Sequence, residues 1–108
     1  MTHASEPEPE PIACSLDATS LGERADEWRA LVASSVTAVE AGARAVGLVL
    51  APSDDALTAA ANLAQREKQC CPFFEVSIIL EADRRTLVLS VPSGAEDALA
   101  GFVALLRS

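Results

Sequence analysis

Pro72 follows two adjacent cysteines, Cys70 and Cys71, and fixes where the chain changes from helix to strand. Proline disfavours helical backbone in the residue before it, so a helix that carries these cysteines must end near Cys71. Apolar side chains then alternate with more polar ones, which is the period of a half-buried strand. The apolar positions are Phe74, Val76, Ile78 and Leu80. This stretch predicts a helix that ends on two thiols and leads directly into a strand.

Two helices are predicted before that strand. Ser20 and Glu23 have the spacing of a capping box, so the first helix should begin at Ser20. Its apolar residues recur at helical spacing and predict a buried stripe with Trp28 as the core anchor. They are Leu21, Ala25, Trp28, Leu31 and Val32. The second helix should begin at Ser53, whose hydroxyl can cap the first amides, and should end near Cys71.

Two hairpins and a third helix complete the pattern. Residues 36–41 and 45–50 are rich in apolar and β-branched side chains, which predicts the first hairpin. Residues 83–85 should turn the chain of the second hairpin, because apolar positions return on one face after them. These positions are Leu87, Leu89 and Val91. Ser93 and Glu96 offer a second capping box at the start of an amphipathic helix.

This order predicts one α+β domain over residues 12–108, preceded by a disordered, acidic, proline-rich tail over residues 1–11. Residues 12–16 are a weak candidate for a first strand. An antiparallel sheet with helices on one face buries the apolar stripes, so we expect a ferredoxin-like sandwich or a variant of it with an added strand and C-terminal helix. Ile79 and Val88 would then lie on the open face, where a homodimer can form.

The charge balance argues against several classes of partner. Sixteen acidic and eight scattered basic residues give a net charge of −8. Nucleic-acid and anionic-membrane binding use a concentrated basic surface, so neither is expected, whereas cations suit the balance. No apolar run approaches the roughly 20 residues that span a bilayer. Three cysteines is an odd number, so we expect a cytoplasmic protein that keeps all three as thiols.

The cysteines are the centre of the predicted chemistry. Residues three and four apart on a helix are neighbours, so Glu67 should face both Cys70 and Cys71. A ferredoxin-like sheet pairs its first strand with the strand that follows the second helix. With that topology Cys14 also approaches the pair. The candidate metal ligands are therefore Cys14, Glu67, Cys70 and Cys71.

Electrostatics separates the possible uses of these residues. The negative end of the helix dipole and the charge of Glu67 both oppose thiolate formation at Cys70 and Cys71. Nucleophilic cysteines need the opposite surroundings, and the single histidine, His3, lies in the tail. A hydrolase or thiol transferase is therefore disfavoured. A bound cation deprotonates thiols and is stabilised by the same negative charge.

Three sulfurs suit Cu(I), Hg(II), Cd(II) or As(III), and Zn(II) would take a fourth ligand from Glu67 or water. Two other readings stay open. Cys14 can form a redox disulfide with Cys70 or Cys71, or all three cysteines can be packing residues of a dimeric interaction module.

The motifs resemble a family of small bacterial domains, common in actinobacteria, that occur alone or behind MerR-type helix-turn-helix regulators. The residues that carry the resemblance are Cys14 to Asp17, Glu23-Arg24, Glu27 to Leu31, and Glu67-x-x-Cys70-Cys71-Pro72-Phe73-Phe74. The resemblance implies heavy-metal biology and the same four ligand positions. Because no DNA-binding segment precedes Cys14, we expect a free-standing metal-binding protein and not direct transcriptional control.

Overall fold

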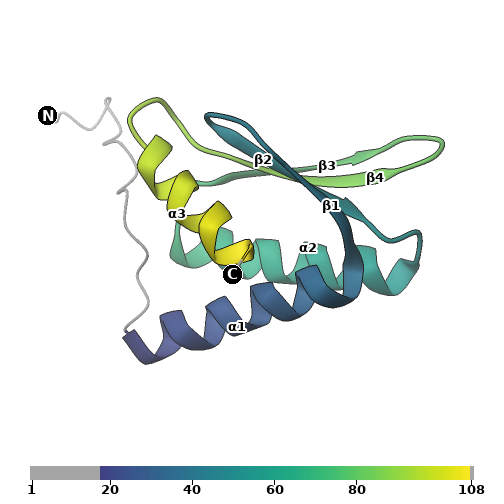
Figure 1. Ribbon diagram of the computed structural model, residues 1–108, viewed down its shortest axis with the longest axis horizontal. Helices are drawn as coiled ribbons and strands as arrows, with labels where there is room; N and C mark the ends of the chain where they lie inside the picture. The colour runs from purple at the N-terminus through teal and green to yellow at the C-terminus, as the bar shows by residue number, and fades with distance from the viewer. Residues whose placement is uncertain (1–17, 108) are drawn as a thin grey trace, which may run out of the picture.

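Three helices cover one face of a four-stranded antiparallel sheet in the part of the chain that the structure describes, residues 18–107 (Figure 1). The structure is a computed structural model. Its elements follow the predicted order: α1 (Ala18–Ser35), β1 (Val36–Ala41), β2 (Ala45–Leu50), α2 (Asp54–Cys70), β3 (Glu75–Leu80), β4 (Arg85–Ser90) and α3 (Glu96–Leu106). The predicted α+β class is therefore confirmed, and the arrangement is consistent with a ferredoxin-like fold.

The sheet has the strand order β1-β2-β4-β3, so β4 lies at its centre beside β2. Both predicted hairpins form, and the first has the predicted bounds. β4 pairs with one edge of β3, and no strand in the described part of the chain pairs with the other edge. The expected first strand at residues 12–16, the expected tail at residues 1–11 and Cys14 lie outside the described residues.

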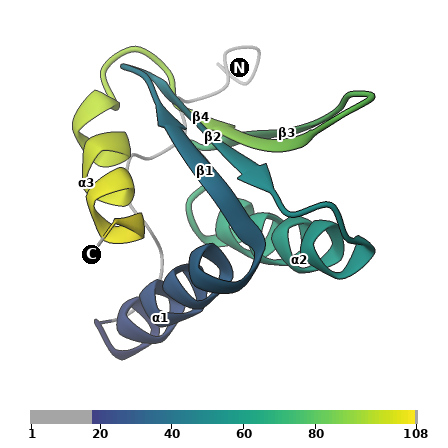
Figure 2. The same ribbon diagram turned by 45° about the vertical axis from the view of Figure 1, so that its right-hand side comes forward.

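The core lies between the central strands and the three helices. Val46, Leu48, Leu87 and Leu89 point from β2 and β4 into this layer and are fully buried. Trp28 of α1 is only 1% exposed, which confirms its role as the core anchor. α1 packs against both α2 and α3 (Figure 2). None of the described helices is long and apolar enough to span a bilayer.

β3 is more exposed than the alternating pattern predicts. Ile78 pairs with buried Leu87, so its side chain lies on the helix-facing side, yet it is 38% exposed and Leu80 is 66% exposed. β3 is an edge strand, and its hairpin with β4 extends beyond the helices (Figure 1). The prediction of a half-buried strand is therefore wrong towards the tip of the hairpin. On the other face Ile79 is 48% exposed and Val88 is half-buried.

Of the three predicted N-terminal caps, the one at Ser53 is confirmed, and those at Ser20 and Ser93 are wrong. Ser53 caps α2, because its hydroxyl accepts a 3.1 Å hydrogen bond from the Ala56 amide. α1 begins at Ala18, so Ser20 lies inside its first turn instead of at its cap. Leu21 is 44% exposed, so it does not belong to the buried stripe that was predicted for this helix.

The second wrong capping prediction concerns α3. Its N-cap is Ala95, whose methyl group cannot accept a hydrogen bond, and not Ser93. The Glu96 carboxylate instead accepts a 2.8 Å hydrogen bond from the Gly94 amide. Gly94 has a φ of 100°, a left-handed conformation that glycine adopts without strain. The chain therefore enters α3 through a glycine turn.

Candidate metal centre

The last turn of α2 brings Glu67, Cys70 and Cys71 together in one buried group. One ligand atom from each residue lies within 4.8 Å of the others. Their exposed fractions are only 5%, 7% and 3%. Glu67 and Cys70 belong to α2, and Cys71 is its C-cap residue. The predicted convergence of the carboxylate with the paired cysteines is confirmed for these three residues, and they could hold a metal ion.

The backbone of the Cys-Cys-Pro turn fixes these positions. The Cys71 amide donates a 2.7 Å hydrogen bond to the Glu67 carbonyl, which closes the last helical turn. Phe74 then donates to the Cys71 carbonyl at 3.1 Å, and the Lys68 ammonium donates to the Pro72 carbonyl at 2.6 Å. The helix therefore ends where the proline predicts, and both cysteines lie on its last turn.

The two sulfur atoms are neighbours but are not bonded to each other. The Cys70 and Cys71 Sγ atoms lie 4.0 Å apart, whereas a disulfide has a length of about 2.05 Å. The Cys70 thiol also lies 3.6 Å from the Glu67 carbonyl oxygen, to which it can donate. An ion between the two sulfurs would take the place of this thiol hydrogen bond.

Two residues of α1 complete the group, and the sequence analysis did not assign either of them to the site. The Trp28 indole donates a 2.8 Å hydrogen bond from Nε1 to Glu67 Oε1. Arg24 Nη1 lies 3.3 Å from the same oxygen and 3.3 Å from Cys70 Sγ. Arg24 and Trp28 are four residues apart, so they lie on one face of a helix. The four-residue spacing could have shown that Arg24 and Trp28 share a face of α1, but it does not show that this face contacts the end of α2.

Arg24 changes the electrostatics expected at the thiols. Burial alone would lower the pKa of Arg24, but the hydrogen bond and charge of Cys70, followed by those of Glu67, raise it. By the same interaction the guanidinium favours a thiolate at Cys70. The helix dipole and the Glu67 charge oppose thiolate formation, and Arg24 acts against both. The sequence analysis did not expect a cation at this position. The centre contains a permanent positive charge as well as three possible anionic ligands.

Four aromatic side chains contact one another in the core, and one of them, Trp28, is hydrogen-bonded to Glu67. Trp28 and Phe102 meet edge to face with ring centroids 5.1 Å apart, and Phe74 lies 5.3 Å from Phe102. Phe73 and Phe74 are 4.7 Å apart and both are buried. Low solvent access strengthens every charge interaction beside the sulfurs. The cluster joins α1, the segment after the cysteine turn and α3.

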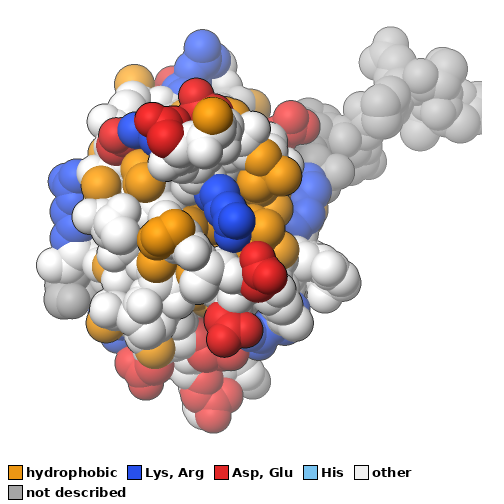
Figure 3. All heavy atoms as spheres, turned by 90° about the vertical axis from the view of Figure 1, so that its right-hand side faces the viewer, with side chains coloured by type: hydrophobic (Ala, Val, Ile, Leu, Met, Phe, Trp, Pro, Cys, Tyr) orange, Lys and Arg blue, Asp and Glu red, His pale blue; other side chains and the backbone are white. Residues whose placement is uncertain are grey.

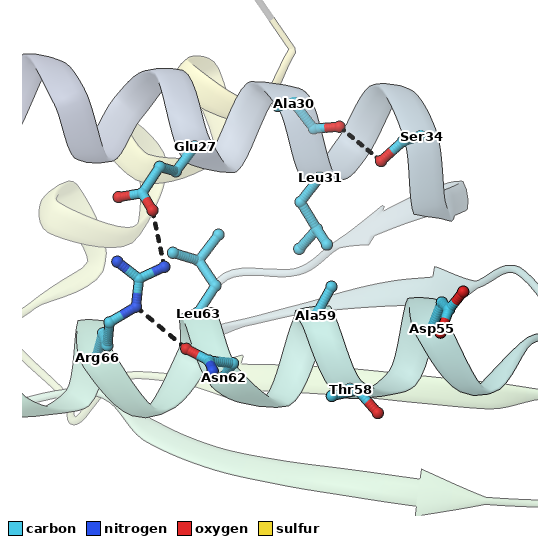
Figure 4. Close-up of a pocket in the computed structure, with 10 residues that line it drawn as sticks. All are labelled: Glu27, Ala30, Leu31, Ser34, Asp55, Thr58, Ala59, Asn62, Leu63 and Arg66. Carbon is cyan, nitrogen blue, oxygen red and sulfur yellow. Dashed lines mark hydrogen bonds and ion pairs between the residues drawn. The ribbon is translucent and has the colours of Figure 1, made fainter.

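Further ion pairs extend from Arg24 along the interface of α1 and α2. Glu27 lies 3.5 Å from Arg24 Nε and accepts a 2.7 Å hydrogen bond from Arg66. Arg66 also donates to Asn62. Figure 4 shows Glu27 and Arg66 pointing towards each other at one end of an open groove of about 590 Å³. Neither Glu67 nor the two cysteines line this groove, so it is separate from the candidate centre.

Figure 3 shows one face of the molecule with its acidic, basic and apolar side chains in different colours. Lys and Arg side chains lie there among acidic and apolar ones instead of forming a stripe. This agrees with the scattered basic residues of the sequence.

Comparison with known proteins gives no assignment. No family model, curated protein or solved structure matches the chain. The class that the fold and site define is therefore an α+β domain with a buried Glu-Cys-Cys group.

Proposed function

We propose that the protein captures a soft metal or metalloid ion with Cys14, Cys70 and Cys71 as thiolate ligands. Glu67 acts as a further ligand or as an outer-shell carboxylate. The observation that supports the proposal is the buried group of Glu67, Cys70 and Cys71, with its ligand atoms within 4.8 Å of one another. Thiolates prefer soft ions such as Cu(I) and Hg(II), and As(III) and Zn(II) also bind thiols.

Cys14 is the proposed third ligand, and it lies outside the described residues. α1 and α2 are arranged so that Arg24, near the start of α1, contacts residues at the end of α2. Cys14 precedes the first described residue of α1, Ala18, by four positions. The assignment of Cys14 as the third thiolate therefore rests on the ligand set predicted from the sequence, and the Cys14→Ser variant tests it.

The cellular setting belongs to the same proposal. A reducing compartment such as the cytoplasm keeps three thiols available for an ion. Resemblance to domains found with MerR-type regulators favours sequestration or sensing of heavy metals. The open face of the sheet, where Ile79 is 48% exposed and Val88 is half-buried, favours a homodimer through that face.

Native mass spectrometry tests ion capture directly. The reduced protein is titrated separately with Zn(II), Cu(I), Hg(II) and As(III), beside the Cys14→Ser and Cys71→Ser variants. We expect one ion per chain, with binding weakened sharply in both variants. A matched control is Ser93→Ala, since Ser93 is exposed and lies outside the candidate centre. Full retention of the ion by Cys14→Ser would remove Cys14 from the site, and an ion-free wild-type protein would refute ion capture.

The contact of Arg24 with Cys70 favours a second candidate, a thiol-redox protein. In this reaction Cys14 and either Cys70 or Cys71 lose two electrons and two protons and form a disulfide. A low-molecular-weight disulfide accepts them and becomes two thiols. Equilibration with glutathione buffers, followed by thiol counting, tests it. Reversible loss of two thiols per chain together with negligible ion affinity would favour this candidate over ion capture.

A further inference from the structure

We propose that oxidation by a small hydroperoxide joins Cys70 to Cys71 in a disulfide between adjacent residues, and that this disulfide closes the centre to ions. The inference rests on the proposed function and specifies how the same site is regulated. It depends on Cys70 and Cys71 alone. The separation of their sulfurs, their burial and the backbone at the end of α2 carry it.

The side chains of Cys70 and Cys71 converge although the two residues are adjacent. On a helix such neighbours do not face each other, and on a strand they point to opposite faces. Cys71 has a φ of −127° and a ψ of 76°, so its backbone is neither helical nor that of a regular strand. The two Sγ atoms lie 4.0 Å apart at this break. A disulfide of about 2.05 Å therefore needs an approach of only roughly 2 Å.

Burial limits which oxidant can reach the pair. Cys70 is 7% exposed and Cys71 is 3% exposed, so a bulky disulfide such as oxidised glutathione has little room to attach to either sulfur. Hydrogen peroxide is small enough, and the neighbouring thiol lies ready for the product of its reaction.

The oxidation proceeds in two steps. One thiol reacts with hydrogen peroxide, becomes a sulfenic acid and releases one water. The neighbouring thiol then displaces the sulfenic oxygen as a second water, and the sulfur-sulfur bond forms. The two sulfurs lose two electrons in total, and the peroxide accepts them.

The geometry of adjacent residues makes this disulfide easy to reopen. Adjacent Cα atoms are about 3.8 Å apart, whereas disulfide-linked residues usually have Cα atoms about 4.4–6.8 Å apart. Such a bond is strained, and strained disulfides are reduced readily. The strained ring contains the peptide bond whose Cys71 amide donates the 2.7 Å hydrogen bond to the Glu67 carbonyl. Closure therefore removes two thiol ligands and weakens the turn that positions Glu67.

Peptide mapping of the wild type after treatment with hydrogen peroxide is the first test. Trypsin leaves Cys70 and Cys71 together in the peptide of residues 69–84, and Cys14 in the peptide of residues 1–24. We expect the peptide 69–84 to become lighter by two hydrogen atoms and to regain them with dithiothreitol. Two intact thiols in it, or a cross-link to the peptide 1–24, would overturn this inference and leave ion capture intact.

Two variants with equal numbers of thiols test the assignment independently. Cys14→Ser keeps Cys70 and Cys71 and should form the disulfide as the wild type does. Cys71→Ser keeps Cys14 and Cys70, and its Cys70 should remain a sulfenic acid or oxidise further to a sulfinic acid. Equal yields of an internal disulfide in the two variants would contradict the pairing of adjacent residues.

Ion uptake connects the disulfide with the proposed function. The reduced and the oxidised wild type are each titrated with Zn(II), Cu(I), Hg(II) and As(III), and native mass spectrometry counts the bound ions. The ion that the reduced protein retains should bind at least about tenfold more weakly to the oxidised protein, because two thiol ligands are used up. Equal affinities would overturn control by oxidation. A reduced protein that binds no ion would instead overturn ion capture itself, even where the disulfide forms.

Discussion

Trp28 Nε1 donates a 2.8 Å hydrogen bond to Glu67 Oε1 and so joins the core anchor of α1 to the end of α2 across 39 positions of sequence. Both side chains are almost completely buried. The bond satisfies an indole that has only one polar atom and a carboxylate that needs donors inside the core. The candidate centre is consequently part of the folding core and not an addition to its surface.

Replacing Trp28 with phenylalanine should destabilise the protein by at least about 1.5–3 kcal/mol, because a hydrogen bond to a charged group is lost and the smaller ring leaves a cavity in the core. Urea denaturation followed by circular dichroism measures the effect. The same substitution in a Glu67→Gln background is the control. If the hydrogen bond is the cause, the second loss is smaller than the first, and equal losses would assign the effect to ring packing alone.

Ser53→Ala should destabilise the protein by about 1 kcal/mol, since the Ser53 hydroxyl accepts the Ala56 amide at the start of α2. Ser93→Ala is the matched control at the start of α3. Because Ala95 is the N-cap there, its effect should stay within about 0.5 kcal/mol. Thermal and urea unfolding of both variants measure the difference. A loss of the same size at Ser93 would contradict the cap assignment of α3.

The exposed end of β3 gives a third prediction. Leu80→Lys should change the free energy of unfolding by no more than about 0.5 kcal/mol, because Leu80 is 66% exposed. Leu89→Ala, on the central strand β4, should cost about 2–5 kcal/mol because Leu89 is fully buried. Urea titration of the two variants tests the contrast. A large loss in Leu80→Lys, with sedimentation showing dissociation, would instead place Leu80 in an interface.

Local patterns in the sequence predicted where most helices and strands lie along the chain, but not which elements pack side by side. The bounds of β1 and β2 follow from apolar runs around Gly42, and the end of α2 follows from Pro72. The exposure of Ile78 could not be predicted, because it depends on which strand lies at the edge of the sheet. Strand order is set by packing between distant segments, whereas the alternating pattern describes only one strand.

In the candidate site too, the residues close in sequence were predicted and the distant one was not. Glu67, Cys70 and Cys71 are close in sequence, so helical spacing alone predicted their convergence. Arg24 meets Glu67 from 43 positions away, through the packing of α1 on α2. No periodicity within α1 identifies that partner. The sequence therefore predicted the anionic ligands but missed the cation that alters their chemistry.

Stability should fall with acid through Glu27. The hydrogen bond from Arg66 lowers the pKa of Glu27 below its ordinary value of 4.5, and the charges of Arg66 and Arg24 add to the shift. A carboxyl with a lowered folded pKa stabilises the fold above its unfolded pKa, and this contribution is lost as the pH falls through the folded value. The loss should thus begin near pH 4.5 and continue below it.

Unfolding free energies measured between pH 6 and pH 3 test this expectation. Glu27→Gln should show a shallower decline than the wild type over the acidic part of that range. Glu23→Gln is the control, because Glu23 is an exposed glutamate on the same helix. Parallel curves for the wild type and Glu27→Gln would exclude the Arg66 contact as a source of acid sensitivity.

The coupling between Arg24 and Glu67 can be measured by a double-mutant cycle. Arg24→Gln leaves Glu67 with the Trp28 donor but removes its cation, and Glu67→Gln leaves Arg24 beside Cys70 without the carboxylate charge. Each single variant should therefore be destabilised. Once one charge is absent, removal of the other loses less, so the two losses should not add. For contacting residues in one network we expect a coupling of about 0.5–3 kcal/mol.

The cycle also separates the two charges that Arg24 contacts. The Arg24→Gln variant is combined in a second cycle with Cys70→Ser, whose hydroxyl does not ionise near neutral pH. Coupling in this second cycle that grows as the pH rises from 6 to 9 reports an interaction of Arg24 with a Cys70 thiolate. Coupling near zero over the whole range means that Arg24 does not interact with the Cys70 sulfur, because this cycle isolates the Arg24–Cys70 pair. The redox candidate then loses the contact that favours it, while ion capture by the paired sulfurs is unaffected.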